Sequence, residues 1–187
     1  MESELMQKAQ ALEDAFFFQE DQRLLESLRE MKALEMTTGL LAEVSGLSDS
    51  RLLLRLAQLG VTPSMAASLS ILPQVAVVWA DGSVDAVERR VLMASLDHTF
   101  FFPTIDRDIL EAWLSFPPPG SLVDSWEAFV RHLVFELGPE ETAALARELL
   151  GQARGVAEAA GNFLGFGGIS PAEKKVLDRI EGALTRG

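Results

Sequence analysis

Apolar residues recur at spacings of three and four along almost the whole chain, and this feature most limits what it can fold into. One example is the run Leu24, Leu25, Leu28, Met31 and Leu34. This spacing places apolar side chains on one face of an α-helix, whereas the alternation typical of strands is nearly absent. The sequence therefore predicts an all-α protein built as a single-domain array of helices.

Residues that favour helix N-termini occur at intervals along the chain, between the segments with helical apolar spacing. A capping residue followed by a first-turn residue occurs at Thr62-Pro63, at Gly138-Pro139 and at Ser170-Pro171, for example. We expect about eight to ten helices of ordinary length. Their predicted ranges are 3–19, 21–37, 39–45, 49–59, 63–79, 85–99, 104–116, 121–137, 139–164 and 171–185.

The stretch from Leu56 to Ala80 contains no charged residue and is long enough to raise the question of a membrane span. Pro63, Pro73 and several polar residues interrupt it, so we expect a buried helix pair and no membrane span. With 48% hydrophobic residues among 187 and a mean hydropathy of +0.17, the chain is not of the disordered class. A large core, or a core plus an interface, is expected.

The charge balance is strongly acidic. The 28 Asp and Glu residues outweigh 16 Lys and Arg, which gives a net charge of −12. This charge repels nucleic acid and anionic lipid, so we expect no nucleic acid partner and favour cations, basic partners or a homodimer. The chain has no cysteine, which excludes disulfides and thiolate chemistry. Its acidic start, Met1–Glu4, lacks the basic region of a signal peptide, and a cytoplasmic location is expected.

A sequence pattern occurs twice, at Gly82–Leu92 and, 85 residues later, at Gly167–Leu177. Each copy has a turn glycine, an apolar residue, a helix-capping residue, a glutamate three positions after the cap, two basic residues and Val-Leu. The repetition predicts a helix-hairpin unit used twice. On physical grounds alone, Asp85 and Glu88 form a capping box that satisfies free backbone N–H groups at the start of a helix.

The first copy also matches the second half of a calcium-binding EF-hand loop. Asp81, Asp85 and Glu88 supply the carboxylates that hard cations such as calcium or magnesium prefer. Val77 and Trp79 stand where an EF-hand has its first two acidic ligands, which argues against a complete site of that kind. Two interpretations therefore stay open, helix capping and a weaker divalent-cation site at these three carboxylates.

The stretch Val77–Arg89 resembles the alanine-aspartate-glycine signature of the tellurite-resistance TerB-like family, and Gly168–Glu173 resembles its later copy. The resemblance implies an all-helical fold with an internal pseudo-twofold repeat and an association with bacterial stress responses. It divides the chain into a TerB-like helical domain, residues 61–187, and an N-terminal helical extension packed on the core, residues 1–60.

The resemblance also implies that acidic residues of these loops are metal ligands. Carried over to this chain, it nominates Asp81 and Glu88 first and Asp85 second. In the second copy Phe166 stands in place of the first aspartate, which puts a metal site shared by two loops in doubt.

The sequence favours a non-enzymatic interaction module. His98 and His132 lack partners at ligand spacing, apart from Glu136 four residues after His132, and no serine elbow is present. A scaffold homodimer without a ligand is an alternative. It is motivated by Gly151 and Gly155, which would let another helix approach closely.

A helix-turn-helix DNA-binding regulator is the second alternative. The segment Leu41–Leu52 has the helix, glycine turn and second helix of such a unit. Two acidic residues balance Arg51 and Arg55 there, so the basic surface that phosphate contacts require is missing. A structural helical hairpin is the favoured interpretation.

Overall fold

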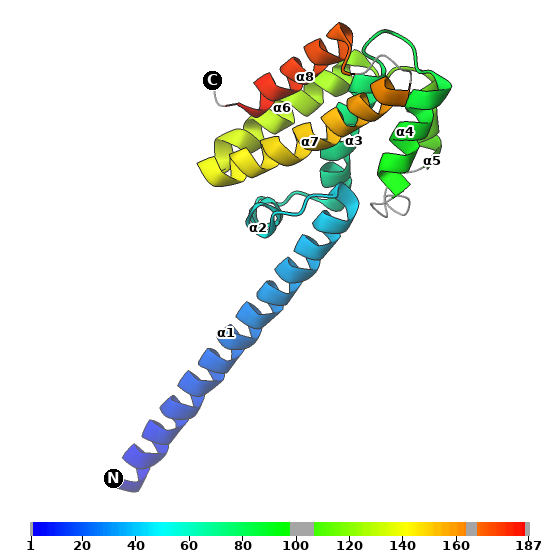
Figure 1. Ribbon diagram of the computed structural model, residues 1–187. Helices are drawn as coiled ribbons and strands as arrows, with labels where there is room; N and C mark the ends of the chain where they lie inside the picture. The colour runs from blue at the N-terminus through cyan, green and yellow to red at the C-terminus, as the bar shows by residue number, and fades with distance from the viewer. Residues whose placement is uncertain (1, 98–106, 164–167, 186–187) are drawn as a thin grey trace. The chain divides into compact units, whose positions relative to one another are not determined.

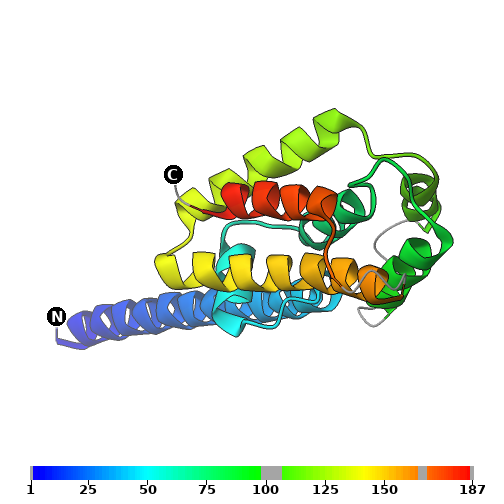
Figure 2. The same ribbon diagram turned by 45° about the horizontal axis from the view of Figure 1, so that its top comes forward.

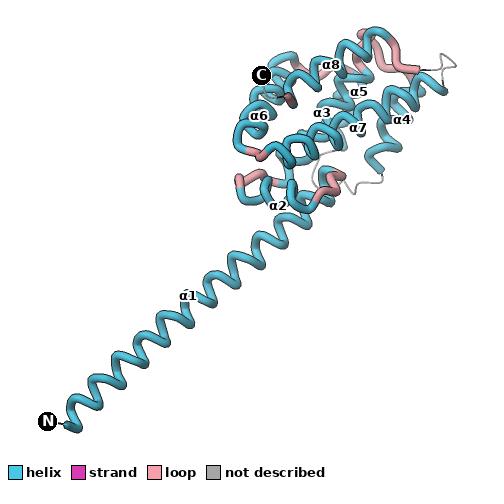
Figure 3. Tube along the Cα trace, turned by 60° about the vertical axis from the view of Figure 1, so that its left-hand side comes forward, coloured by secondary structure: helices cyan, strands magenta, loops and turns pink. Residues whose placement is uncertain are grey.

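A computed structural model describes residues 2–97, 107–163 and 168–185, and the side chains of residues 18–96, 110–161 and 168–185 among them. These ranges contain eight α-helices and no strand, which confirms the predicted all-α class (Figure 3). The helices are α1 (Glu2–Ser45), α2 (Ser50–Gln58), α3 (Pro63–Val78), α4 (Ala86–Asp97), α5 (Arg107–Ser115), α6 (Gly120–Glu136), α7 (Pro139–Phe163) and α8 (Pro171–Leu184).

The first three predicted helices are one continuous helix of 44 residues, α1. The predicted ends at residues 19 and 37 are therefore wrong. No proline occurs in this stretch, and Gly39 weakens a helix by only about 1 kcal/mol relative to alanine, which is too little to end it. Gly46, with a φ of 65°, follows the helix and ends it.

The chain divides into two compact units, Met1–Met36 and Thr37–Gly187. The first unit is the N-terminal part of α1, and the last turns of α1 belong to the second unit. Leu41, Leu52 and Leu56 are fully buried, so residues 37–60 contribute to the core of that second unit. The boundary predicted at residue 60, between an extension and a TerB-like domain, stays a prediction.

Helix α3 lies at the centre of the second unit, where it contacts α4, α6, α7 and α8. Leu69, Ile71 and Val75 are fully buried, as expected for a helix that is apolar on all sides. Figure 1 labels these helices. Helix α8 contacts both α6 and α7 and lies between them in the view of Figure 2, and α3 packs against all three. Among the described residues, no helix combines the length and the apolar character that a membrane crossing requires.

Candidate functional site

The acidic loop, residues 81–85, connects α3 with α4. Gly82 has a φ of 93°, a conformation that glycine adopts without a steric cost. Asp81 Oδ1 accepts hydrogen bonds from the backbone N of Ser83, at 3.0 Å, and from its hydroxyl, at 3.2 Å. The carboxylate of Asp81 therefore stabilises the turn that precedes α4.

The predicted capping box is present at the start of α4. Asp85 Oδ1 accepts from the backbone N of Val87 at 2.6 Å and of Glu88 at 2.8 Å. In return, the backbone N of Asp85 donates to Glu88 Oε2 at 2.8 Å. The second copy has the same reciprocal pair of bonds, because Ser170 N donates to Glu173 Oε2 at 2.6 Å and Glu173 N donates to Ser170 Oγ at 3.2 Å.

Glu88 has a raised pKa. Burial is the largest cause, and the negative charges of Asp85, Asp81 and Glu173 add to it, against the backbone hydrogen bond from Asp85, which lowers the pKa. Glu173 is the residue of the second copy that corresponds to Glu88. Its effect on Glu88 means that the two capping boxes lie within electrostatic reach of each other.

The described ranges contain no group of three or more His, Asp or Glu residues gathered so that they could hold a metal ion. Asp81, Asp85 and Glu88 each direct a carboxylate oxygen at a backbone N–H group of the acidic loop or of the first turn of α4. Helix capping accounts for these contacts. A divalent cation at the three residues stays a prediction.

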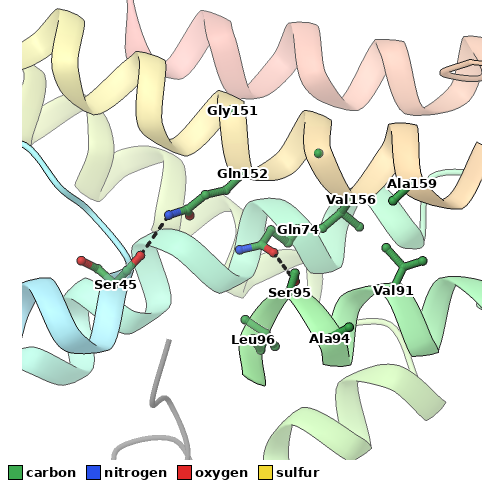
Figure 4. A pocket seen from close by; sticks show the side chains of 11 residues that line it. Ser45, Gln74, Val91, Ala94, Ser95, Leu96, Gly151, Gln152, Val156 and Ala159 are labelled. Atoms are coloured by element: carbon green, nitrogen blue, oxygen red, sulfur yellow. Dashed lines mark hydrogen bonds between the residues drawn. The ribbon is translucent and has the colours of Figure 1, made fainter. Parts of the chain in front are cut away.

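A hollow of about 420 Å³ lies between α4 and α7, near the end of α1 (Figure 4). Small and apolar side chains form most of its described surface, and the polar side chains among the described lining residues are uncharged. We call it the α4–α7 hollow. Its lining residues are Ser45, Gln74, Val91, Ala94, Ser95, Leu96, Gly151, Gln152, Gly155, Val156 and Ala159.

The polar side chains gather at one end of the hollow, and Val91 and Ala159 lie at the other (Figure 4). Ser95 Oγ donates to Gln74 Oε1 at 2.9 Å, and Gln152 Nε2 donates to the backbone O of Ser45 at 3.1 Å. Gln152 Oε1 is buried and has no hydrogen-bond partner within the described part of the chain. The hollow thus has an apolar end and a neutral, amide-rich end.

Gly151 and Gly155 leave this space open on the α7 side. A Cβ added at either position would meet no described atom within 4 Å. The close helix packing that the sequence suggested at these glycines is therefore not found inside the described part of the chain. The space beside them is part of the hollow.

A second cavity, of about 240 Å³, is lined by residues of α3, α6 and α8 and of the segments that follow α3 and α5. Trp79 comes from the segment before the acidic loop, and Val176 and Arg179 come from α8. Glu127 lies at its edge between two arginines, with Arg131 Nη2 at 3.0 Å and Arg179 on its other oxygen. The ion pair of Glu127 with Arg179 joins α6 to α8, whereas Arg131 is on α6 like Glu127. The indole of Trp79 donates a 2.7 Å hydrogen bond to the backbone O of Trp113.

Helix α2, the second helix of the suggested helix-turn-helix, packs on α7. Its leucines Leu52 and Leu53 are buried. Arg51 Nη1 donates to Glu140 Oε2 at 3.1 Å, and Arg55 Nη2 donates to the backbone O of Glu136 at 3.2 Å. Both basic side chains of α2 thus have partners in the protein, which fits a structural helical hairpin.

The N-terminal unit presents an apolar surface of its own. Leu24, Leu28 and Met31 lie on one face of α1, with 61%, 50% and 63% of each residue exposed. Leu25 and Phe18 are also exposed. We call Leu24, Leu28 and Met31 the α1 stripe.

The sequence interpretation did not single out the polar residues of the α4–α7 hollow. Gln74 could have been noticed in the sequence, because it is a polar residue within the stretch Leu56–Ala80 that has no charge. Ser95 and Gln152 have no such feature. His98 and Phe166 lie outside the described residues.

Comparisons with protein-family models, with curated proteins and with solved structures find no match to this chain.

Proposed function

We propose that this protein is a non-catalytic interaction module that pairs with a second copy of itself through residues 22–36 of α1. The exposed stripe Leu24, Leu28 and Met31 carries the proposal. Its spacings of four and three residues are those of a helix–helix seam, in which apolar side chains of one helix fill spaces between those of another.

Pairing would remove a large apolar surface from water. Fully burying a leucine or methionine side chain stabilises a protein by about 1.5–3 kcal/mol, and these three residues are at least half exposed. Most of the stability of a helix in a protein comes from packing of its apolar face. A second helix on this stripe supplies such packing.

The charge pattern of α1 favours a second copy in the antiparallel orientation. Six acidic residues and one lysine give residues 2–21 a formal charge of −5. Residues 22–36 are neutral, with three basic and three acidic residues. An antiparallel pair superposes the two neutral segments and keeps the two acidic segments apart, whereas a parallel pair brings the acidic segments together.

The remaining parts of the function are proposals of the same kind. We assign residues 61–187 to a TerB-like domain and place the protein in a bacterial stress response. Two loops with the same capping geometry support this assignment, at Asp85 with Glu88 and at Ser170 with Glu173.

The oligomeric state tests the proposal. Sedimentation equilibrium of the native chain should give twice the chain mass of 20.4 kDa at micromolar concentrations. A triple variant, Leu24→Gln, Leu28→Gln and Met31→Gln, keeps good helix formers and should be monomeric. The matched control is Phe135→Gln, which removes an apolar side chain that is 79% exposed on α6 and should leave the dimer intact. A native chain that stays monomeric, with the stripe covered by its own second unit or open to another protein, contradicts the proposal.

The orientation is tested with one spin label. The chain has no cysteine, so a cysteine introduced at Gln19 is the only attachment point. In an antiparallel pair centred on residue 29, two such labels lie about 30 Å apart along the helix axis. A parallel pair brings them to within about 20 Å, since packed helices lie 8–10 Å apart. Double electron–electron resonance distinguishes the two distances, and the shorter one overturns the antiparallel arrangement.

A further inference from the structure

We infer, on the basis of the pairing proposed above, that Met31 makes this pairing sensitive to oxidation, because its sulfoxide separates the two copies. Met31 is a member of the α1 stripe and is 63% exposed. Its thioether is accessible to a peroxide in the unpaired chain and becomes part of the apolar seam in the pair. The chain contains no cysteine, so this response involves no thiol of the protein.

Oxidation replaces an apolar group of the α1 stripe with a polar one. The sulfur of Met31 attacks one oxygen of hydrogen peroxide, the O–O bond breaks and an S–O bond forms. The sulfur is oxidised by two electrons, and the peroxide is reduced to water. The sulfoxide oxygen accepts hydrogen bonds, which water supplies in the free chain and an apolar helix seam does not.

A symmetric pair contains this group twice. The same stripe of both copies forms the seam, so the Met31 of each copy enters it. Each sulfoxide without a hydrogen-bond donor lowers the affinity, and we expect the dissociation constant of the pair to rise at least about tenfold. Oxidised chain should therefore be monomeric at concentrations at which the native chain is largely paired.

Met36 provides an internal reference for Met31. It lies on the same helix and in the same compact unit, and it is 64% exposed. Successive residues of an α-helix are about 100° apart around its axis, which places Met31 about 20° from Leu24 and Met36 about 120° from it. A peroxide therefore reaches both methionines to a similar extent in the free chain, but only Met31 lies in the seam.

The first experiment measures how pairing protects the two methionines. The full chain is treated with hydrogen peroxide at concentrations below and above the pairing range, and peptide mass spectrometry follows the oxidation of each methionine. In the paired chain Met31 should react at least about threefold more slowly than in the dilute chain, because only the unpaired fraction exposes it. Met36 should react at the same rate in both samples. Equal protection of the two residues overturns the inference.

The second experiment measures pairing after oxidation, by sedimentation equilibrium. The native chain and Met36→Leu should both lose pairing when they are oxidised, with the tenfold rise in dissociation constant stated above. Oxidised Met31→Leu should stay paired, because leucine fills a similar volume and has no sulfur. Treatment with methionine sulfoxide reductases should restore the pairing of the native chain.

A variant that needs no peroxide covers the case in which Met31→Leu itself fails to pair. Met31→Gln places a polar side chain in the seam and should weaken pairing as the sulfoxide does, whereas Met36→Gln should change the dissociation constant by less than about twofold. Unchanged pairing of Met31→Gln overturns the inference.

Failure of the inference and failure of the pairing give different results. A native chain that is monomeric before any treatment contradicts both. A native chain that is paired before treatment and stays paired with Met31 fully oxidised overturns the oxidation sensitivity alone. Loss of pairing in oxidised Met31→Leu also overturns it, because the sensitivity then belongs to another residue.

Discussion

Glu88 contributes both a hydrogen-bond acceptor and a negative charge, and one substitution can remove the charge alone. Its carboxylate accepts a hydrogen bond from the backbone N of Asp85, and its pKa is raised by burial and by the nearby acidic residues. A glutamine at this position keeps an acceptor for the backbone N–H and removes the charge. The hydrogen bond and the charge of residue 88 can therefore be studied apart.

The raised pKa of Glu88 predicts a pH effect of defined sign. A carboxyl whose pKa is higher in the folded than in the unfolded chain binds its proton more tightly in the folded state. Its contribution to stability is greatest below its ordinary value of 4.5 and is lost as the pH rises through the folded pKa. The free energy of unfolding of Glu88→Gln should therefore rise relative to the native chain between about pH 4 and pH 7, by less than about 1 kcal/mol, because Glu88 is only partly buried and solvent screens its charge. Urea unfolding at both pH values measures it, and a relative decrease contradicts the stated direction.

The capping interpretation gives a prediction for cations. Calorimetric titration of chelator-stripped protein with calcium and with magnesium should give no saturable heat. Glu88→Ala should lower the free energy of unfolding by about 0.5–2 kcal/mol, because a backbone N–H at the helix start loses its acceptor. Saturable binding that is lost in both Asp81→Ala and Glu88→Ala would instead establish the acidic loop as a divalent-cation site.

Glu148 joins α7 to the start of α2, a role that the sequence does not reveal. Its carboxylate accepts from the backbone N of Ser48 at 2.6 Å and of Asp49 at 3.0 Å, and from the hydroxyl of Ser48 at 3.1 Å. Glu148→Gln replaces one acceptor oxygen by a donor and should cost about 1–3 kcal/mol in urea unfolding. Glu158→Gln, at an exposed position on the same helix, should change stability by less than about 0.5 kcal/mol. Equal effects of the two substitutions would contradict the role assigned to Glu148.

Sequence could predict the local hydrogen bonds of the candidate site but not its long-range ones. The capping box of Asp85 and Glu88 joins residues three apart, so its spacing is visible in the chain. The contact of Glu148 with Ser48 joins residues one hundred apart and depends on how α2 and α7 pack. The polar end of the α4–α7 hollow is of the second kind, since Gln152 and Ser45 are 107 residues apart.

Among the elements, α7 has two kinds of glycine, and the same substitution should have opposite effects on them. Gly151→Ala and Gly155→Ala should each raise the free energy of unfolding by about 0.5–1 kcal/mol, because alanine restricts the unfolded chain and nothing described lies near the added methyl group. Gly161→Ala should be destabilising, because its Cβ would collide with the backbone O of Gly168. Thermal unfolding measures all three. Destabilisation by alanine at 151 or 155 would mean that another chain segment occupies the hollow.

The elements also show where sequence patterns are strong and where they fail. The apolar character of α3 on all sides predicted a buried helix, because no other arrangement removes all of its faces from water. The end of a helix is a weaker signal. Predicted ends at residues 19 and 37 are wrong because polar residues there neither break a helix nor prevent its continuation. Apolar spacing indicates that a segment is helical, but it does not indicate how far the helix continues.

For the molecule as a whole, the two compact units predict separate roles for folding and pairing. The core residues that the structure describes are all in Thr37–Gly187, whereas the stripe Leu24, Leu28 and Met31 is in Met1–Met36. A chain that begins at Thr37 should therefore keep its helical circular dichroism and cooperative unfolding, since it retains every described core residue. The same chain should be monomeric in sedimentation.

The concentration dependence of thermal unfolding connects these two roles. If pairing through α1 stabilises the folded chain by mass action, the Tm of the full chain should rise with protein concentration. The chain that begins at Thr37 should have a Tm independent of concentration, because it lacks the stripe. A shortened chain whose Tm still rises with concentration would mean that the second unit pairs by itself, through a surface other than α1. A shortened chain that unfolds without cooperativity would mean that residues 1–36 are needed for the core and not only for pairing.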